Sequence, residues 1–417
     1  MSLSRRAVLG LSAAALCLPR RLGAETPTSD HKFVFVYCAG GWDPALVFAP
    51  NFAGTIAHDP SDVAASAGGI DFTDNATRPS VRSFFESWGG RSLVLNGIEV
   101  PSVAHDVCTR WIMTGDGRAA TDDWVSVLAG RASGSLLLPN VHVAGPLFPW
   151  RYPSASVRVG AHRQLEALLS GEALAASTSP VVGLGAEAAA AQEALLRRRV
   201  ARWAARADLP DAAGLGAAEL LASDRATALE AHLSALAGDA DDLDDALAIV
   251  ANCLEQGLSR VGFVSSGLGG NGGWDAHANV QLQGMQFEAL FASLGGLAAR
   301  LDAAPGAGGG TMLDQTTIVV FSEMGRSPNT NAQLGKDHWT WTSALLFGGR
   351  IVGGRTVGAW TDGLTGTPID LASGEVDEAG TSLLPGHLGA TLLALGDVDP
   401  EEFVDAEAGA PIRGVLG

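Results

Sequence analysis

The side chains of this sequence best suited to hold a metal ion lie in short motifs rich in glycine and tryptophan. The tetrapeptide Gly-Gly-Trp-Asp occurs twice, ending at Asp43 and at Asp275, and the second copy continues to His277. Carboxylate oxygens and imidazole nitrogens bind Zn, Mn, Fe or Ca, depending on their geometry. We therefore predict a site for one or two divalent ions. Its predicted ligands are Asp43, Asp275, His277, Glu323, Asp337 and His338.

Each of these residues also has a structural alternative. Asp43 precedes Pro44 and is placed to cap a turn, and Asp275 is placed to cap a helix that begins near Ala278. A single histidine such as His277 is more often structural than a ligand. Capping alone does not explain why the same acidic motif appears twice, with Glu323 in a third comparable position. The joint pattern favours a shared site.

Two cations close to these motifs are candidates for holding an anion. Arg326 follows Glu323, and Lys336 precedes Asp337 and His338. Arginine suits bidentate contacts to phosphate or sulfate, and lysine acts as a point charge. The alternative for both is solvation at the surface. For His387, at the start of a segment that looks helical, we expect a capping or packing role.

Strand-like runs precede the acidic motifs. Near-continuous apolar segments separated by long helical ones favour an α/β fold with a mostly parallel central sheet and helices on both faces. Ligand sites in such sheets lie beyond the carboxyl ends of the strands. The two Gly-Gly-Trp-Asp motifs and Glu323 each follow a predicted strand. The predicted strands are 32–39, 92–98, 140–144, 260–266, 316–322, 343–348 and 356–360.

Between about residues 166 and 257 the sequence becomes rich in alanine, leucine and arginine. We expect a helical insertion with helices near 187–207, 217–237 and 241–255. The last of these opens with acidic residues, which suit a helix N-terminus. The insertion is expected to lie within a single α/β domain spanning residues 25–417.

The N-terminus has the pattern of a twin-arginine (Tat) export signal over residues 1–24. Arg5 and Arg6 precede an apolar run from Val8 to Leu18, which is too short to cross a bilayer. An ordinary secretory signal or a retained anchor is the alternative. We expect the Tat translocon as an export partner, a periplasmic or secreted location, and no membrane span after signal cleavage.

Composition limits the classes of function. The formal net charge is −18, which argues against a nucleic-acid partner. Hydrophobic residues make up 47% and charged residues 17%, enough for a substantial core. Beyond the signal the cysteines are Cys38, Cys108 and Cys253, whose spacing fits no zinc or redox motif. We expect each to be a small buried hydrophobic residue.

Taken in order, the motifs resemble a family. Ser-Arg-Arg, the two Gly-Gly-Trp-Asp segments, Phe-Ser-Glu-Met-Gly-Arg and Lys-Asp-His-Trp look like a Tat-exported bacterial family known as domain of unknown function fifteen-oh-one. The resemblance runs from about His31 to Pro400. That family is similar in fold to the alkaline phosphatases and sulfatases. The resemblance implies an alkaline-phosphatase-like sheet with metal ligands at its carboxyl edge, matched here by Asp43, Asp275, His277, Glu323 and His338.

The sequence departs from that pattern at two places. Where phosphatases have an adjacent Asp-His pair, this chain has Glu323 and Met324. Where sulfatase-like enzymes place a nucleophilic Cys, Ser or Thr, the register puts His105. The segment from Cys108 to Arg110 also lacks the formylglycine signature, which disfavours a sulfatase. His105 is a candidate for an extra ligand or a general base.

These observations favour an exported metal-dependent hydrolase of phosphate-type or related anionic esters, akin to phosphatases and phosphodiesterases. His105, Lys336 and Arg326 are its candidate catalytic residues, and the substrate is expected to be a small anionic ester. The alternative is a non-catalytic envelope protein that keeps the fold and binds a protein partner. A serine hydrolase is a weaker third reading, because no Gly-x-Ser-x-Gly motif is present.

Overall fold

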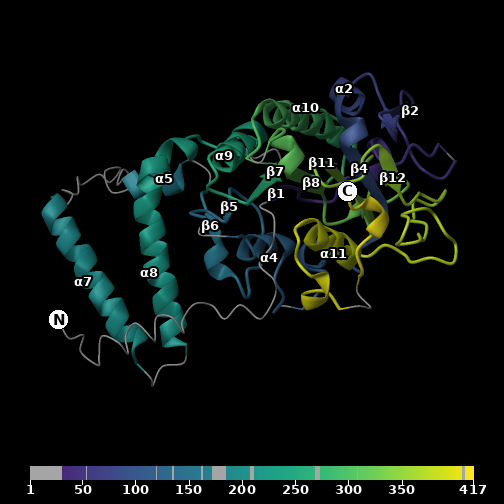
Figure 1. Cartoon of the computed structure of the whole chain (residues 1–417). Coiled ribbons are helices and arrows are strands. Elements are labelled where there is room, and N and C mark those ends of the chain that lie inside the picture. The colour runs from purple at the N-terminus through teal and green to yellow at the C-terminus, as the bar shows by residue number, and fades with distance from the viewer. Residues whose placement is uncertain are drawn as a thin grey trace. The chain divides into compact units, whose positions relative to one another are not determined.

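The computed structural model describes most of the chain beyond the expected signal peptide. The described residues are 31–52, 54–118, 120–133, 136–160, 163–170, 185–206, 211–267, 273–307, 309–405 and 409–417. The expected export signal, residues 1–24, lies outside them. They divide into two compact units, one between Gln164 and Leu236 and the other formed by the remaining described residues (Figure 1).

The larger unit is built on an eight-stranded sheet with the order β12-β4-β11-β8-β1-β7-β5-β6. Neighbouring strands are parallel except at β11, which is antiparallel to β4 and β8. This confirms the mostly parallel sheet. The strands are β1 (Lys32–Cys38), β4 (Ser92–Glu99), β5 (Asn140–His142), β6 (Ser156–Arg158), β7 (Val261–Ser266), β8 (Thr316–Phe321), β11 (Trp341–Gly348) and β12 (Arg355–Val357).

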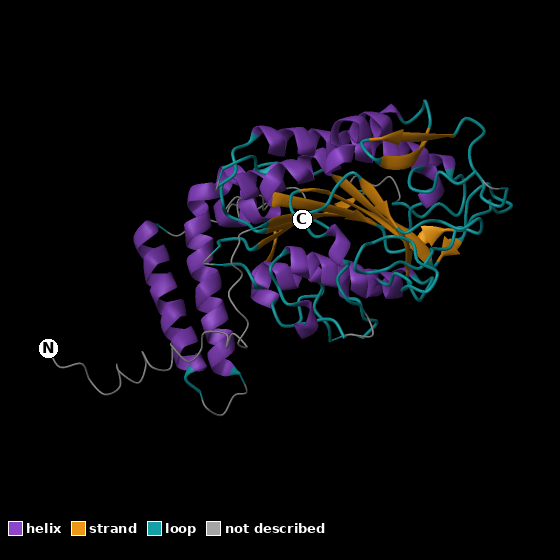
Figure 2. Ribbon diagram, turned by 45° about the vertical axis from the view of Figure 1, so that its right-hand side comes forward, coloured by secondary structure: helices purple, strands orange, loops and turns teal. Residues whose placement is uncertain are grey.

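Helices cover both faces of this sheet, as expected (Figure 2). On one face α2 (Pro79–Trp88) and α9 (Leu243–Glu255) pack against α10 (Gln281–Ala303). On the other, α3 (His105–Thr114) and α4 (Trp124–Gly130) pack against α11 (Pro385–Leu395). Because helices lie on both sides, β1 and β8 are buried along their whole length, which explains their near-continuous apolar sequences.

Shorter elements complete the larger unit. Two small antiparallel pairs are β2 (Val63–Ala67) with β3 (Ile70–Asp74), and β9 (Gly325–Arg326) with β10 (His338–Trp339). The 3-10 turns are η1 (Pro44–Leu46), η2 (Gly89–Arg91), η3 (Pro153–Ala155), η5 (Leu313–Gln315), η6 (Pro400–Glu402) and η7 (Arg413–Val415).

The smaller unit is helical. It contains α5 (Gln164–Ser170), α7 (Ala186–Ala204), α8 (Ala212–Leu229) and the 3-10 segment η4 (Glu230–Ala235). Helices α7 and α8 pack closely where Gly216 faces Ala204, since a Cβ on Gly216 would lie 2.4 Å from the Ala204 Cβ. The third helix that the sequence assigned to the insertion is α9, which instead packs on β7 in the larger unit. Its buried residues include Leu247, Val250 and Leu254, which the helical repeat places on one face.

The carboxyl edge of the sheet is where the polar motifs meet. Strands β8, β1 and β7 are adjacent and parallel, with Tyr37 beside Phe321 and Cys38 beside Ser266. Their following loops therefore leave from one edge. Strand β4 runs in the same direction, so α3 starts there too. Strand β11 runs the opposite way, so β10, which precedes it, also lies at this edge.

All seven predicted strands are present, with ends that differ by a few residues. The sequence analysis missed the short strands β2, β3, β6, β9 and β10, whose two to five residues are too few for a periodic signal. The three described cysteines are buried, as expected, and form no disulfide with one another. His387 is buried and its Nδ1 accepts a hydrogen bond from the backbone N–H of Leu384 (3.0 Å), which confirms its capping role.

Gly40 allows two of these loops to touch. Its φ is +122°, and a Cβ there would lie 2.4 Å from the backbone nitrogen of Asp275. We predict that Gly40→Ala lowers the free energy of unfolding by at least about 3 kcal/mol. The matched control is Gly296→Ala on the exposed side of α10, where a Cβ meets nothing within 4 Å. It should raise stability by about 0.5–1 kcal/mol. Urea titrations that gave equal effects would contradict this packing.

Candidate metal centre

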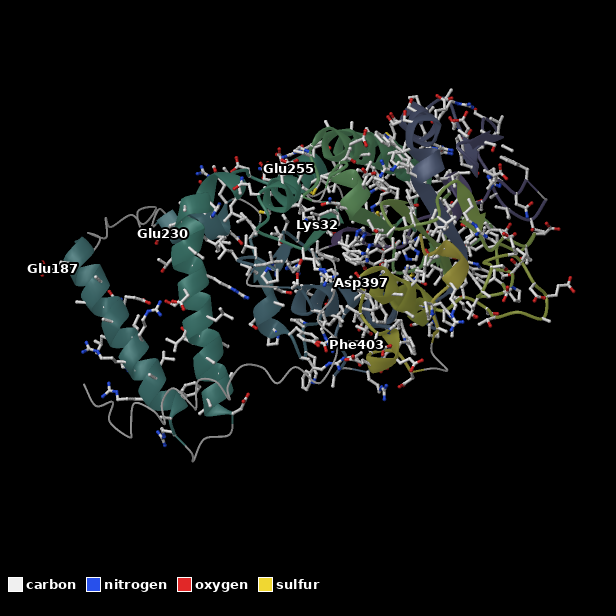
Figure 3. All side chains as sticks on the ribbon, viewed as in Figure 1. Lys32, Glu187, Glu230, Glu255, Asp397 and Phe403 are labelled. Atoms are coloured by element: carbon white, nitrogen blue, oxygen red, sulfur yellow. The ribbon has the colours of Figure 1, made fainter. Side chains whose placement is uncertain are left out.

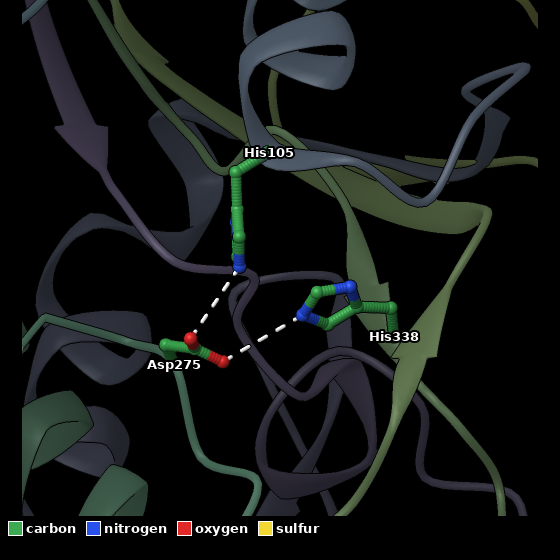
Figure 4. A group of neighbouring side chains, drawn as sticks. All are labelled: His105, Asp275 and His338. Carbon is green, nitrogen blue, oxygen red and sulfur yellow. Dashed lines mark ion pairs between the residues drawn. The ribbon is translucent and has the colours of Figure 1, made fainter.

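Three side chains from separate elements converge at the carboxyl edge of the sheet. They are His105 from the first turn of α3, Asp275 from the loop after β7, and His338 from β10 (Figure 4). One ligand atom from each lies within 4.8 Å of the other two. Their side chains are partly exposed, 38% for His105 and 43% for Asp275, so the group is open to solvent.

The imidazoles present the same nitrogen to the centre of the group. His105 Nε2 lies 3.4 Å from Asp275 Oδ2, and His338 Nε2 lies 3.7 Å from Asp275 Oδ1. His277 joins them, with its Nε2 2.8 Å from His338 Nε2 and 3.3 Å from Asp275 Oδ1. Two unprotonated ring nitrogens at 2.8 Å repel each other, so this arrangement requires a proton or a cation at the centre.

Each imidazole has an acceptor at its other nitrogen. His105 Nδ1 lies 2.8 Å from Glu323 Oε1, and His338 Nδ1 lies 2.6 Å from the Val103 carbonyl oxygen. His277 Nδ1 lies 3.5 Å from Asp337 Oδ1. Acceptors at Nδ1 favour the tautomer that carries its proton there and leaves the Nε2 lone pair free. Outer carboxylates and carbonyls orient metal-binding histidines in this way.

The electrostatics of the group suit a cation. The hydrogen bond to Glu323 raises the pKa of His105, while burial lowers the pKa of His338. Partial burial works to raise the pKa of Asp275, but the adjoining Arg326 guanidinium outweighs it and holds that pKa below the usual range. His105 Nε2 is buried and has no hydrogen-bond partner. An ionised carboxylate beside free imidazole lone pairs fits a divalent ion, and the His/Asp group is able to hold one.

Glu323 has a different place from the one predicted. Its carboxylate is 1% exposed and accepts hydrogen bonds from the Gly40 backbone nitrogen at 2.8 and 3.1 Å, from Ser322 Oγ at 3.1 Å and from His105. These contacts use both oxygens. In the structure Glu323 therefore lies behind His105 and holds its imidazole, and among the described residues it is not part of the group able to hold a metal. Asp337 likewise lies behind His277 and bonds to Asn331.

Arg326, predicted to hold an anion or else to be solvated at the surface, is buried. Its guanidinium is 0% exposed and donates to the carbonyl oxygens of Gly40, Gly41 (2.8 Å) and Lys336 (3.1 Å) and to Asp275 Oδ1 (2.6 Å). With its donors engaged, it has no free edge for a substrate anion. Its role is to fix the loops and to position Asp275.

Asp43 was predicted to be a metal ligand and Lys336 to hold an anion. In the structure the two side chains form a buried ion pair with each other. The Lys336 Nζ lies 2.7 Å from Asp43 Oδ2, and both side chains are 1% exposed. Lys336 also donates to the Ala57 carbonyl, and Asp43 Oδ1 caps η1 at the Ala45 N–H. Among the described residues, the group able to hold a metal does not include Asp43. The capping alternative for Asp43 is the one that the structure shows.

Of the predicted residues, the structure brings together Asp275, His277, His338 and His105. Sequence reasoning missed two residues that support the site. The backbone carbonyl of Val103 contacts His338 Nδ1, and Gln283 Oε1 accepts a hydrogen bond from the Asp43 N–H at 2.6 Å. Neither role leaves a signal in residue type or spacing.

The comparison with protein families covers the motifs in the C-terminal part of the chain. Residues 230–415 match the family described as "Protein of unknown function (DUF1501)". The predicted resemblance is confirmed over this segment. The DUF1501 segment contains Asp275, His277, Glu323, Arg326 and His338, whereas Asp43 and His105 lie outside it. Among proteins with curated descriptions, none matches this chain.

Sulfatase-like enzymes are among the similar solved structures. The complex of Ps i-CgsB with k-i-k-neocarrahexaose aligns at 9% identity and a TM-score of 0.42, covering 91% of this chain and 75% of that one. The PsFucS1 sulfatase from Pseudoalteromonas sp. aligns at 11% identity and a TM-score of 0.34, covering 98% and 79%. These likenesses concern the arrangement of the chain and say nothing of its activity. No described helix has the length and apolar character needed to cross a membrane.

The buried pair yields a test of its structural role. Removing one partner leaves an uncompensated buried charge, which typically costs 3–5 kcal/mol. We predict that Lys336→Met lowers the free energy of unfolding by about 3 kcal/mol or more. The double variant Asp43→Asn, Lys336→Met should recover part of that loss in urea titrations. A Lys336→Met protein of unchanged stability would show that the lysine is not held in this pair.

Proposed function

We propose that this protein is a metal-dependent hydrolase of phosphate-type or related anionic esters. The observation that supports it most directly is the convergence of three imidazole Nε2 atoms on Asp275, each with an acceptor behind its Nδ1. Nitrogen ligands with one carboxylate suit Zn, Mn or Fe, while the oxygen-only preference of Ca fits this set less well.

In this proposal Asp275, His105 and His338 are the ligands. When bound, the ion supplies the positive charge that polarises an ester oxygen and acidifies a water. The charge of the ion would do the work first expected of Lys336 and Arg326. Both of these cations are instead paired with carboxylates within the protein. The exposure of the group leaves room for a substrate, as in open catalytic sites and unlike closed structural ones.

His277 is placed to accept a proton from the attacking water. Its side chain is 47% exposed, and its Nε2 faces the group while Asp337 lies 3.5 Å from its Nδ1. It would accept a proton from water at Nε2, and the Asp337 carboxylate would stabilise the resulting imidazolium. His277 is thus the catalytic base in this account, and Glu323 is a positioning residue that acts through His105.

The second candidate is a non-catalytic envelope protein that keeps the metal group. It is favoured by the first turn of α3, where the residue in the expected nucleophile position is His105 and its imidazole is bonded to Glu323. Fully metallated protein that turns over no phosphomonoester, phosphodiester or sulfate ester would support this candidate against the hydrolase.

Removal of a ligand should remove both metal and activity. We predict that elemental analysis finds near-stoichiometric metal in the unaltered protein, and that Asp275→Asn and His338→Gln each lose it. Both should lower hydrolysis of p-nitrophenyl phosphate or its diester by at least about 100-fold. His58→Gln is the control, because His58 lies outside the group and contacts the Asn51 carbonyl.

His277→Gln separates the ligands from the base. This variant should retain most of the metal and lose mainly kcat. Metal retention in Asp275→Asn, or activity without metal in the unaltered protein, would count against the hydrolase. Loss of metal in His277→Gln would instead make His277 a ligand.

We also propose that the protein is exported through the Tat route to the periplasm or beyond the cell. Arg5 and Arg6 support this, and export of a folded chain would carry a metal loaded in the cytoplasm. Fractionation of cells that produce an Arg5→Lys, Arg6→Lys variant should show precursor retained in the cytoplasm. Normal export of the variant would contradict the Tat route.

A further inference from the structure

A cavity of about 550 Å³ opens in the larger unit at the end of α3 away from the histidines. Its lining includes Trp111 and Thr114 from α3, Trp150, and Phe403 after η6. Since His105 begins α3 and Thr114 ends it, roughly 14 Å of helix separates the cavity from the metal centre. The volume lies within the range of small-molecule sites.

Aromatic rings form the apolar part of the cavity. Trp150 is 65% exposed, while Trp111 and Phe403 are half-buried; Phe403 is labelled in Figure 3. Gly117 lets its loop lie against Trp111, because a Cβ there would be 2.8 Å from the indole Nε1. Two indoles and a phenyl ring thus offer flat apolar surface to a ligand.

Two polar side chains of the lining, Asp116 and Arg151, are held in place by their neighbours. Asp116 accepts hydrogen bonds from the Arg118 backbone nitrogen at 2.8 Å and from Thr121 Oγ1 at 3.3 Å. The Arg151 Nε donates to buried Asp122 at 2.6 Å, and its guanidinium lies 4.4 Å from the Phe403 ring centre. Because these side chains are already ordered, a ligand bears less of the cost of fixing them.

The charges of the lining cancel. Asp116 and Asp405 contribute two carboxylates, and Arg118 and Arg151 contribute two guanidiniums. A phosphate or sulfate would meet the carboxylates in a protein of net charge −18, and a cation would meet the guanidiniums. An uncharged ligand avoids both. Hydroxyl groups suit such a lining, because each one donates to a carboxylate and accepts from a guanidinium.

We propose that this cavity binds an uncharged saccharide. The C–H face of a sugar ring would stack on the exposed indole of Trp150, and its hydroxyls would bond to Asp116, Asp405 and Arg118. The site is separate from the metal centre and does not depend on the proposed hydrolase activity.

Calorimetric titration with cellohexaose, maltohexaose, xylohexaose and chitohexaose tests the proposal on the full mature protein. At least one should bind with a Kd of roughly 1 mM or tighter, and binding should persist in EDTA. Trp150→Ala should weaken that binding at least about tenfold. Because Trp150 is exposed, Trp150→Ala should fold normally, which circular dichroism checks. Trp203→Ala on α7, an exposed tryptophan of the smaller unit, should leave the Kd unchanged.

Three outcomes would overturn the proposal. They are no binding of any of the four sugars at roughly 10 mM, sugar binding that Trp150→Ala leaves intact, and tight binding of adenosine with none of the sugars. The last would assign the cavity to planar aromatic ligands. Because EDTA removes the metal but not the cavity, failure here is distinguishable from failure of the hydrolase.

Discussion

The buried guanidinium of Arg326 is the contact on which the site depends. It donates to backbone carbonyls in the loop after β1 and before β10, and to the carboxylate of Asp275 after β7. Three segments far apart in sequence are therefore fixed by one planar group. Lysine cannot replace it, because an ammonium lacks the fork of donors that reaches several acceptors at once. Loss of this group would leave buried carbonyls unpaired and Asp275 unsupported.

The sheet brings the other residues of the candidate site to the same place. Strands β4, β8, β1 and β7 run in one direction and end at one edge, so the loops after β1, β7 and β8 and the start of α3 meet there. His338 arrives differently, on β10 just before β11, the strand that runs antiparallel to its neighbours in the eight-stranded sheet. Behind the imidazoles, Glu323, Asp337 and the Val103 carbonyl orient the rings. The site thus has an inner group of imidazoles and a set of acceptors behind it. Glu323, one of these acceptors, is 1% exposed, whereas the His105 side chain in front of it is 38% exposed.

Much of the fold was readable from the sequence, because apolar runs of buried parallel strands and the amphipathic face of α9 are strong patterns. The meeting of Asp275, His277 and His338 was also predicted, since motifs after parallel strands share an edge. The roles of Asp43, Lys336, Arg326 and Glu323 were not. Whether a charged side chain faces a ligand or a buried partner depends on side-chain direction, which residue spacing does not encode.

Residue spacing also left the role of His105 open, because it does not encode side-chain direction. The sequence offered it as an extra ligand or a base, but only the direction of β4 and the start of α3 at this edge of the sheet place its Nε2 beside Asp275. The third helix of the expected insertion shows a related limit. Its composition resembles that of α7 and α8, yet its apolar face packs on β7, and contacts of this kind are decided by the tertiary fold.

Anomalous diffraction from crystals of the protein purified without chelators, collected at the Zn, Mn and Fe absorption edges, tests the central claim most directly. The account predicts one peak bounded by the Nε2 atoms of His105 and His338 and the carboxylate of Asp275. A peak at Asp43, or fully folded and metal-free crystals from protein purified without chelators, would contradict it.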